Sequence, residues 1–299
     1  MARTRQPKLR AQLGGIPIAS SCQSGRSRHN LLLMFSNRTL FFPVARAWDG
    51  VGRARILSVG LLLFLALPLW AERFYLPEGR PDGIALLAPP PKSGSAEEAA
   101  DLASARAVFK GRTPEEEARA MKDASLSIFL FTPAIGDLFR EGNLPKTEAL
   151  FQKVKTDIAE AINTPKNHWK RKRPYELDEN LTLGRPEKSY GYPSGHSTRG
   201  TVQALLLAEI FPQRREAILE FGRTIGWDRV LIGKHFITDI NAGRVLGQAI
   251  VRELMANPSF QRDLAEAKAE ANAAVAAAAA PAQPADKGVP AGATRQGGS

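Results

Sequence analysis

Apolar residues recur every three to four positions through much of the chain. The repeat is clearest at residues 147–162, 194–210, 214–232 and 236–255. This interval places apolar side chains on one face of a helix, whereas a half-buried strand needs a strict alternation that we find nowhere in the sequence. The pattern therefore predicts an all-α fold, organised as a single compact helical domain.

Local signals place several helix ends. Ser95 and Thr113 are each followed three residues later by glutamate, which is the capping-box pattern of a helix start. Pro165 predicts the start of a further helix, which Pro174 ends. Gly233 stands where the helix that begins near residue 214 should stop. We therefore expect separate helices before and after Pro165.

The composition changes at both ends of the helical region. Residues 72–94 are rich in proline and glycine, which predicts an extended arm. Residues 272–299 are mostly alanine, proline and glycine with a few polar residues, which predicts a disordered tail. The helical domain is thus expected over 95–271, with Ser259 capping its short last helix. Residues 175–192 lack an apolar pattern and suit a lid or rim beside a site.

The N-terminal region has the features of a targeting segment. Residues 56–71 are apolar, follow two arginines and end in a small residue, as in a secretory signal peptide cleaved after Ala71. The run is shorter than the ~20 residues that a membrane span needs, and an uncleaved anchor is the alternative. Residues 1–55 form a basic leader of doubtful status, and the natural start is a candidate at Met34 or near Val51. We expect a periplasmic or secreted protein.

The charge is concentrated in that leader. Of a formal net charge of +11, residues 1–55 supply +9, because they contain ten basic residues and one acidic residue. The remainder has 31 bases and 29 acids, so a broad basic surface for nucleic acid is not expected. The one cysteine, Cys22, excludes an intrachain disulfide and a cysteine metal cage.

Two short blocks carry groups suited to holding an anion. Lys166 and Arg173 are seven residues apart, which on the predicted helix is two turns, or about 10 Å along the axis. Alone, such a pair is typical of a solvated helix face. Ser194, Gly195 and His196 begin another predicted helix, where backbone N–H groups and the helix N-terminus favour an oxyanion. Alone, this block is equally a capped turn with a surface histidine.

A third block supplies a histidine, a carboxylate and a further cation. His235 and Asp239 are four residues apart, so that on a helix the carboxylate can accept the Nδ1 proton and present Nε2 to a substrate. Arg229 can grip two phosphate oxygens. A structural His–Asp pair is the alternative. Of the four histidines, we assign no role to His29 and His168.

Together the three blocks resemble the type-2 phosphatidic acid phosphatase superfamily, which includes bacterial class A nonspecific acid phosphatases and vanadium haloperoxidases. The family pattern is Lys-x6-Arg-Pro, Pro-Ser-Gly-His and Ser-Arg-x5-His-x3-Asp. Every specified position matches except residue 228, where Asp228 replaces serine. The similarity to the class A enzymes extends from about Pro89 to Ala271. An acid beside Arg229 is expected to weaken anion binding or to shift the pH optimum.

The resemblance implies an acid phosphatase that hydrolyses soluble phosphate monoesters without a metal or other cofactor. His235 would attack phosphorus to form a phosphohistidine, Asp239 would orient it, and His196 would protonate the leaving oxygen and then activate water. The pH optimum should be mildly acidic and the profile bell-shaped. The groups expected to bind the phosphate are Lys166, Arg173, Ser194, Gly195 and Arg229.

Other functions stay open at this point. A vanadate-dependent haloperoxidase would use the same pocket, with His235 ligating vanadium. A lipid phosphatase normally has several membrane spans, and no apolar run after residue 71 is long enough for one. A noncatalytic anion-binding envelope protein is a third reading, with Asp228 marking decay of the site. The expected partners are small phosphomonoesters, with phosphate or vanadate as inhibitors, and a membrane only through an uncleaved signal segment. A homo-oligomer is left open.

Overall fold

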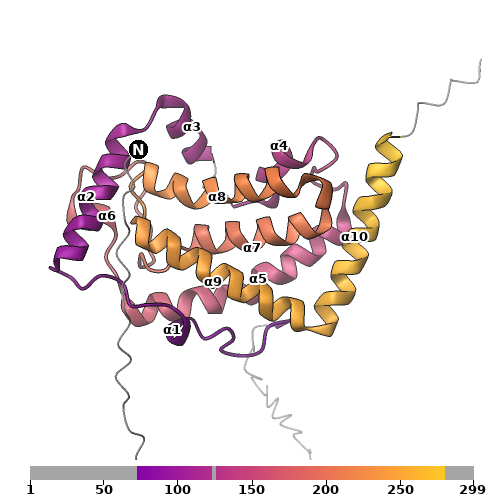
Figure 1. The fold of residues 1–299 in the computed structure, drawn as a ribbon, viewed down its shortest axis with the longest axis horizontal. Helices are drawn as coiled ribbons and strands as arrows, with labels where there is room; N and C mark the ends of the chain where they lie inside the picture. Colours follow the sequence, from indigo (N-terminus) through magenta and orange to yellow (C-terminus); the bar gives the residue numbers. More distant parts are fainter. Residues whose placement is uncertain (1–72, 123–125, 280–299) are drawn as a thin grey trace, which may run out of the picture. The chain divides into compact units, whose positions relative to one another are not determined.

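The computed structural model describes residues 73–122 and 126–279. The predicted all-α fold is confirmed, because these ranges contain helices and no strand (Figure 1). The predicted leader and signal segment lie outside the described residues. No described helix has the length and apolar character needed to cross a membrane. The helices are α1 (Gly83–Leu86), α2 (Ala96–Gly111), α3 (Pro114–Lys122), α4 (Thr132–Ile135), α5 (Pro145–Trp169), α6 (Pro174–Leu177), α7 (Gly195–Ile210), α8 (Arg215–Leu231), α9 (Ile237–Ala256) and α10 (Pro258–Ala279), with 3-10 turns at Ile128–Phe131 and Pro212–Arg214.

Helix α7 is the centre of the arrangement, with α8 and α9 packed along it (Figure 1). Small residues allow this close approach. A Cβ atom at Gly222 of α8 would lie 2.4 Å from the Cβ of Ala204, and one at Gly243 of α9 would lie 2.7 Å from the carbonyl oxygen of Ser194. The second contact brings α9 against the N-terminus of α7. Buried side chains of α5, α7, α8, α9 and α10 share one core.

Helix α5 corrects the prediction of a break at Pro165. The helix is continuous from Pro145 to Trp169, with Pro165 inside it. The helix ends after Trp169, where the C-cap residue Lys170 has a left-handed φ of 48° and its N–H bonds to the carbonyl of Lys166. Arg173 therefore lies beyond the helix in extended backbone, and the expectation that Lys166 and Arg173 share a helix face is wrong.

The proline is tolerated because its φ is helical and only one backbone hydrogen bond is lost. Its ring packs closely under α1, since a Cβ at Gly83 would lie 3.1 Å from the Cγ of Pro165. Tertiary contact thus holds the helix through a residue that usually ends one.

The predicted helix starts near residues 95 and 113 are present. Ser95 Oγ accepts the N–H of Glu98, although the Glu98 carboxylate accepts from Gly94 rather than from Ser95. Thr113 and Glu116 form a reciprocal capping box. Both ends therefore follow from local side-chain chemistry.

The two ends of the helical region differ from expectation. Asn257, not Ser259, caps α10, because its Oδ1 accepts the N–H groups of Ser259 and Phe260 at 2.8 and 3.0 Å. Residues 272–279, predicted to be disordered, continue α10. The predicted arm contains the single turn of α1. The arm starts against α5, where the buried Asp157 carboxylate accepts the N–H groups of residues 74, 75 and 76.

Candidate active site

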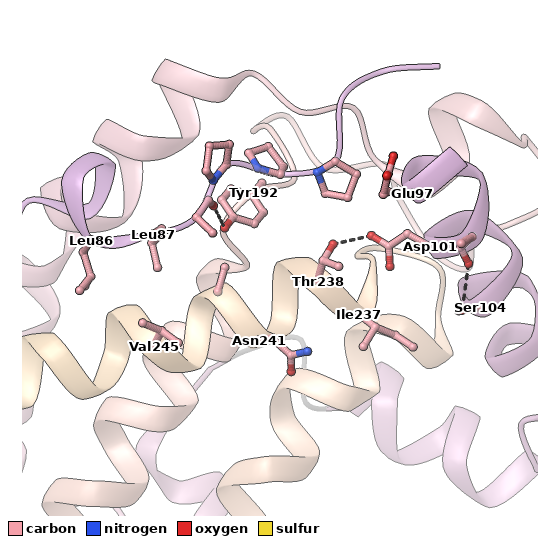
Figure 2. Close-up of a pocket in the computed structure, with 16 residues that line it drawn as sticks. Leu86, Leu87, Glu97, Asp101, Ser104, Tyr192, Ile237, Thr238, Asn241 and Val245 are labelled. Carbon is pink, nitrogen blue, oxygen red and sulfur yellow. Dashed lines mark hydrogen bonds between the residues drawn. The ribbon is translucent and has the colours of Figure 1, made fainter. Parts of the chain in front are cut away.

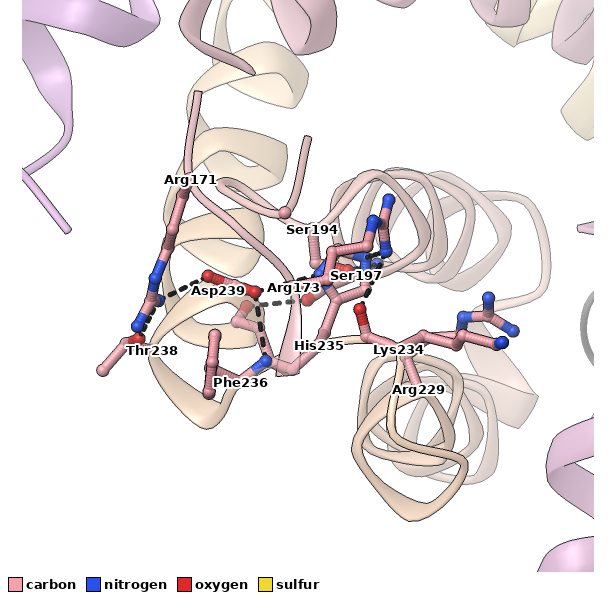
Figure 3. Close-up of polar contacts among 12 residues, drawn as sticks. Arg171, Arg173, Ser194, Ser197, Arg229, Lys234, His235, Phe236, Thr238 and Asp239 are labelled. Atoms are coloured by element: carbon pink, nitrogen blue, oxygen red, sulfur yellow. Dashed lines mark hydrogen bonds and ion pairs between the residues drawn. The ribbon is translucent and has the colours of Figure 1, made fainter. Parts of the chain in front are cut away.

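His235 and Asp239 form a buried pair at the start of α9 (Figure 3). The distance from His235 Nδ1 to Asp239 Oδ2 is 3.1 Å, and the same oxygen accepts the N–H of Phe236 at 3.0 Å. His235 is not on the helix, as the four-residue spacing suggested, but precedes it, since α9 begins at Ile237. The carboxylate reaches back across the first turn, so the expected contact is made by a helix-capping geometry.

A glycine turn delivers His235 to this position. Gly233 ends α8 with a φ of 72°, as predicted, and a Cβ atom there would lie 1.8 Å from the carbonyl oxygen of Leu181. The N–H of Lys234 then bonds to the carbonyl of Arg229 at 2.8 Å. A side chain at 233 would clash with backbone, so this turn requires glycine.

Arg173 lies against the other nitrogen of the same ring. Its Nη1 is 3.2 Å from His235 Nε2 and donates to the carbonyl of Lys234 at 2.8 Å. A guanidinium can only donate hydrogen bonds, so His235 Nε2 is the acceptor in this contact. The proton therefore belongs on Nδ1, facing Asp239. Burial and then the charge of Arg173 hold the pKa of His235 well below its usual value, so the ring is neutral.

Lys166 is buried in the last turn of α5, where its Nζ donates to the carbonyl of Tyr190 at 2.5 Å. The start of α7 is close by, because a Cβ at Gly195 would lie 3.8 Å from Lys166 Cε. Burial and then the neighbouring Arg173 lower the pKa of Lys166 to about 7. A deprotonated amine would be a poor anion ligand, so any anion held by this lysine would bind more weakly as the pH rises above neutrality.

The start of α7 faces His235. His196 is half-buried in the first turn of α7, and its charge is among those that lower the pKa of His235. Ser194 is fully buried; its Oγ caps the helix by accepting the N–H of Ser197 at 3.3 Å. Its own N–H donates to the carbonyl of Asp239 at 3.0 Å. The second and third sequence blocks are therefore joined through the backbone.

Arg229, in the last turn of α8, is buried and paired with a carboxylate of the 175–192 loop. Its Nη2 lies 2.5 Å from Glu187 Oε1. Asp228, the departure from the family pattern, is directed to α3, where Arg119 Nη2 lies 2.8 Å from its Oδ1. The charge of Asp228 favours the protonated state of Arg229. The acid at 228 thus supports the cation beside it.

Comparisons with known proteins find similarity to one superfamily and to bacterial acid phosphatases. Residues 155–262 match the PAP2 superfamily. A non-specific acid phosphatase of Providencia stuartii is 33% identical over 199 residues, which cover 63% of this chain and 80% of the relative. A non-specific acid phosphatase of Salmonella typhimurium is 31% identical over 237 residues, covering 74% of this chain and 93% of the relative.

The chain belongs to the PAP2 superfamily. An acid phosphatase of Zymomonas mobilis is similar as well, at 30% identity over 198 residues, covering 63% of this chain and 75% of the relative.

This PAP2 protein has a second layer of contacts behind the His–Asp pair that sequence reasoning missed. Arg171 is buried; its Nη1 donates to Asp239 Oδ1 and to Thr238 Oγ1, both at 2.6 Å, and its Nη2 donates to Asp101 Oδ2 of α2 at 2.7 Å. Burial raises the pKa of Asp239, and Arg171 opposes that rise. We call the chain Asp101–Arg171–Asp239–His235 the relay. Its arginine opposes the protonation of a carboxylate that has no exposed surface.

A cavity of about 890 Å³ lies at the outer end of the relay (Figure 2). The arm, α2 and α9 enclose it, and its walls include Leu87, Tyr192 and Val245. Asp101 and Thr238 reach it, whereas none of the predicted site residues lines it. The cavity is therefore separate from the cations Lys166, Arg173 and Arg229, whose charges act on His235.

Proposed function

We propose that this protein is a metal-independent acid phosphatase that hydrolyses soluble phosphate monoesters through a phosphohistidine on His235. One observation carries the proposal: His235 has its Nδ1 held by a buried carboxylate and its Nε2 facing a guanidinium. The unprotonated nitrogen is thus aimed at the place where cations would hold a phosphate. The printed names of the bacterial relatives support the same activity.

In the first step, Nε2 of His235 attacks phosphorus while the bond from phosphorus to the ester oxygen breaks. His196, protonated, gives its proton to the leaving oxygen. The imidazole becomes positively charged as the P–N bond forms, and the charged Asp239 stabilises it. Arg171 supports the ionised form of that carboxylate, because it opposes the rise in pKa that burial causes.

In the second step, the now neutral His196 takes a proton from water. The hydroxyl oxygen attacks phosphorus, the P–N bond breaks, and inorganic phosphate leaves with His235 restored. Neutralisation of the equatorial oxygens lowers both barriers, because charge is spread over these oxygens in the transition state. The residues assigned to this task are Lys166, Arg173, Arg229, the backbone N–H of Gly195 and the hydroxyl of Ser194.

Substitution of the nucleophile tests the activity. We expect His235→Ala to lose at least about a thousandfold in kcat with p-nitrophenyl phosphate, because a triad-like unit fails when its nucleophile is removed. His168→Ala is the matched control, since His168 is exposed on α5. Rapid-quench labelling with a ³²P-phosphate ester should trap an acid-labile phosphoprotein in the wild type and not in His235→Ala. Equal turnover by the two variants would refute the proposal.

The finer properties belong to the same proposal. We assign the protein to the periplasm or the secreted fraction, with residues 95–271 as the catalytic domain and phosphate or vanadate as competitive inhibitors. Fractionation of cells that express the full chain, with activity measured in each fraction, checks the location.

A further inference from the structure

A carboxylate is already paired with one of the cations assigned to the phosphate. Glu187 Oε1 lies 2.5 Å from Arg229 Nη2. The negative charge of Glu187 also acts on two further cations: burial lowers the pKa values of Lys166, Lys234 and Arg229, and the charge of Glu187 opposes each of these shifts. Glu187 thus faces cations from α5, from α8 and from the turn after α8. A substrate phosphate would need the same cations.

The two partners differ in exposure. The side chain of Arg229 is 3% exposed, whereas that of Glu187 is 31% exposed. The carboxylate therefore lies on the solvent side of the guanidinium.

The backbone around Glu187 is held without help from its carboxylate. The N–H of Glu187 donates to Tyr175 Oη at 3.0 Å, and Tyr175 Oη is 3.3 Å from the Glu187 carbonyl. Lys234 Nζ donates to Thr182 Oγ1 at 2.7 Å and to the Arg185 carbonyl at 2.9 Å. The Glu187 side chain can therefore rotate toward solvent while the loop stays in place, and residues 175–192 form a fixed rim.

We propose that Glu187 is an internal competitor for the phosphate site: its carboxylate neutralises Arg229 in the free protein, and the phosphate group binds by displacing it. The inference rests on the proposed function only in naming phosphate as the displacing anion. A phosphate dianion has more charge and more acceptor oxygens than a carboxylate, so it can win this exchange.

The competition has a defined kinetic signature. The apparent affinity of a ligand is its intrinsic affinity reduced by the fraction of protein in the competent state. In the proposal, the Glu187 carboxylate has moved away from Arg229 before the chemical step begins. Removing the carboxylate should therefore lower KM and the Kd of phosphate by the same factor and leave kcat unchanged. If Arg229 is free in a tenth of the molecules, that factor is about ten.

The test is Glu187→Gln, with Glu187→Ala as a second variant and Glu179→Gln as control. Glu179 is an exposed acid of the same loop, so the control removes the same charge away from Arg229. We would measure the Kd of inorganic phosphate by isothermal titration calorimetry and KM and kcat for p-nitrophenyl phosphate. We expect both Glu187 variants to bind phosphate about tenfold more tightly, and the control to match the wild type.

Weaker or unchanged phosphate binding in both Glu187 variants would overturn the inference, since it would mean that Glu187 positions Arg229 for the ligand. The inference would also be overturned if no protein in the series bound phosphate. The calorimetric readout needs no turnover, so tighter phosphate binding without hydrolysis in the wild type would refute the proposed function and leave this inference standing.

Discussion

Two neighbours determine the chemical state of His235. Asp239 accepts at Nδ1 and Arg173 donates at Nε2, so a single tautomer satisfies both contacts. Burial and then the cations that we propose to hold a phosphate lower the pKa of the ring and so keep it neutral. The nucleophile is therefore available at mildly acidic pH, where an ordinary imidazole would be protonated.

Arg171→Gln tests the relay. The change leaves two buried carboxylates, those of Asp101 and Asp239, without their shared cation, which should destabilise the fold by roughly 3–5 kcal/mol. We expect kcat to fall about 100-fold, less than the ~10⁴-fold typical when the triad carboxylate itself is replaced. Because Arg171 opposes the raised pKa of Asp239, its loss should also move the acid limb of the kcat profile to higher pH.

The shape of that profile separates the two possible roles of Arg171. Arg171→Lys, which keeps one charge, should restore part of the acid limb. A uniform loss of kcat at every pH, with the limb unmoved, would show that Arg171 serves only the fold.

Lys166 predicts the alkaline limb. With a pKa of about 7, the amine is charged below pH 7 and neutral above it. Only the charged form binds phosphate well, so kcat/KM should fall about tenfold per pH unit above neutrality. The proton of His196, the proposed general acid, is lost on the same side of the profile, so Lys166→Arg, which stays charged, should make this limb less steep and leave the part due to His196. The measurement is kcat/KM for p-nitrophenyl phosphate from pH 5 to 9, and coincident alkaline limbs for the two proteins would contradict the assignment.

Among the elements, the turn between α8 and α9 has the strictest sequence requirement, because residue 233 must be glycine. Gly233→Ala would place a Cβ 1.8 Å from the Leu181 carbonyl oxygen, so the rim or the turn must shift. We expect a loss of at least about 2 kcal/mol in unfolding free energy and a large fall in kcat, because His235 is two residues away. Gly142→Ala is the control: its φ is 85°, but a Cβ there meets nothing within 4 Å.

The control should show the backbone strain alone, about 1–2 kcal/mol, with normal kcat. Urea denaturation and steady-state kinetics measure both quantities. If the two variants behave alike, the close approach of the rim at Gly233 has no special importance.

Local sequence signals predicted the helices well where the deciding contacts are local. The caps at Ser95 and Thr113 and the stop at Gly233 involve residues a few positions apart. Pro165 was misread because the contact that tolerates it is made with Gly83, far away in sequence. Asn257 was missed as a cap because Ser259 is an equally good capping residue and spacing alone does not choose between them.

The site residues also divide into those with a local sequence signal and those whose contacts are distant in sequence. Motif spacing and the family resemblance made His196, His235 and Asp239 the candidates, and the structure brings together the blocks that contain them. Arg171 stood in a basic run that reads as a solvated face. Glu187 carried no local signal, because it lies in a loop and its partner Arg229 is 42 residues further along the chain.

At the scale of the whole molecule, α10 closes the core while its last turns add little. Phe260, Leu264, Ala267 and Ala271 are buried, and the residues after 271 are not. Truncation after Ala271 should therefore leave Tm and kcat near those of the full chain. Truncation after Asn257 removes Phe260 and Leu264 and should cost more than about 5 kcal/mol, a large part of a typical domain's stability.

Thermal unfolding by circular dichroism, with p-nitrophenyl phosphate turnover, distinguishes these outcomes. A normal Tm for the shorter protein would show that α10 is dispensable to the fold.

The reach of the relay has a consequence for chimeras. The family match begins at residue 155, yet the charge that steadies the His235 pair is traced back to Asp101 on α2. A catalytic cassette excised at the borders of the match and transplanted into a relative would carry its nucleophile but leave behind the counter-ion of Arg171. Any exchange of modules between these phosphatases should move α2 together with the motifs, or restore an acid at the equivalent place in the host.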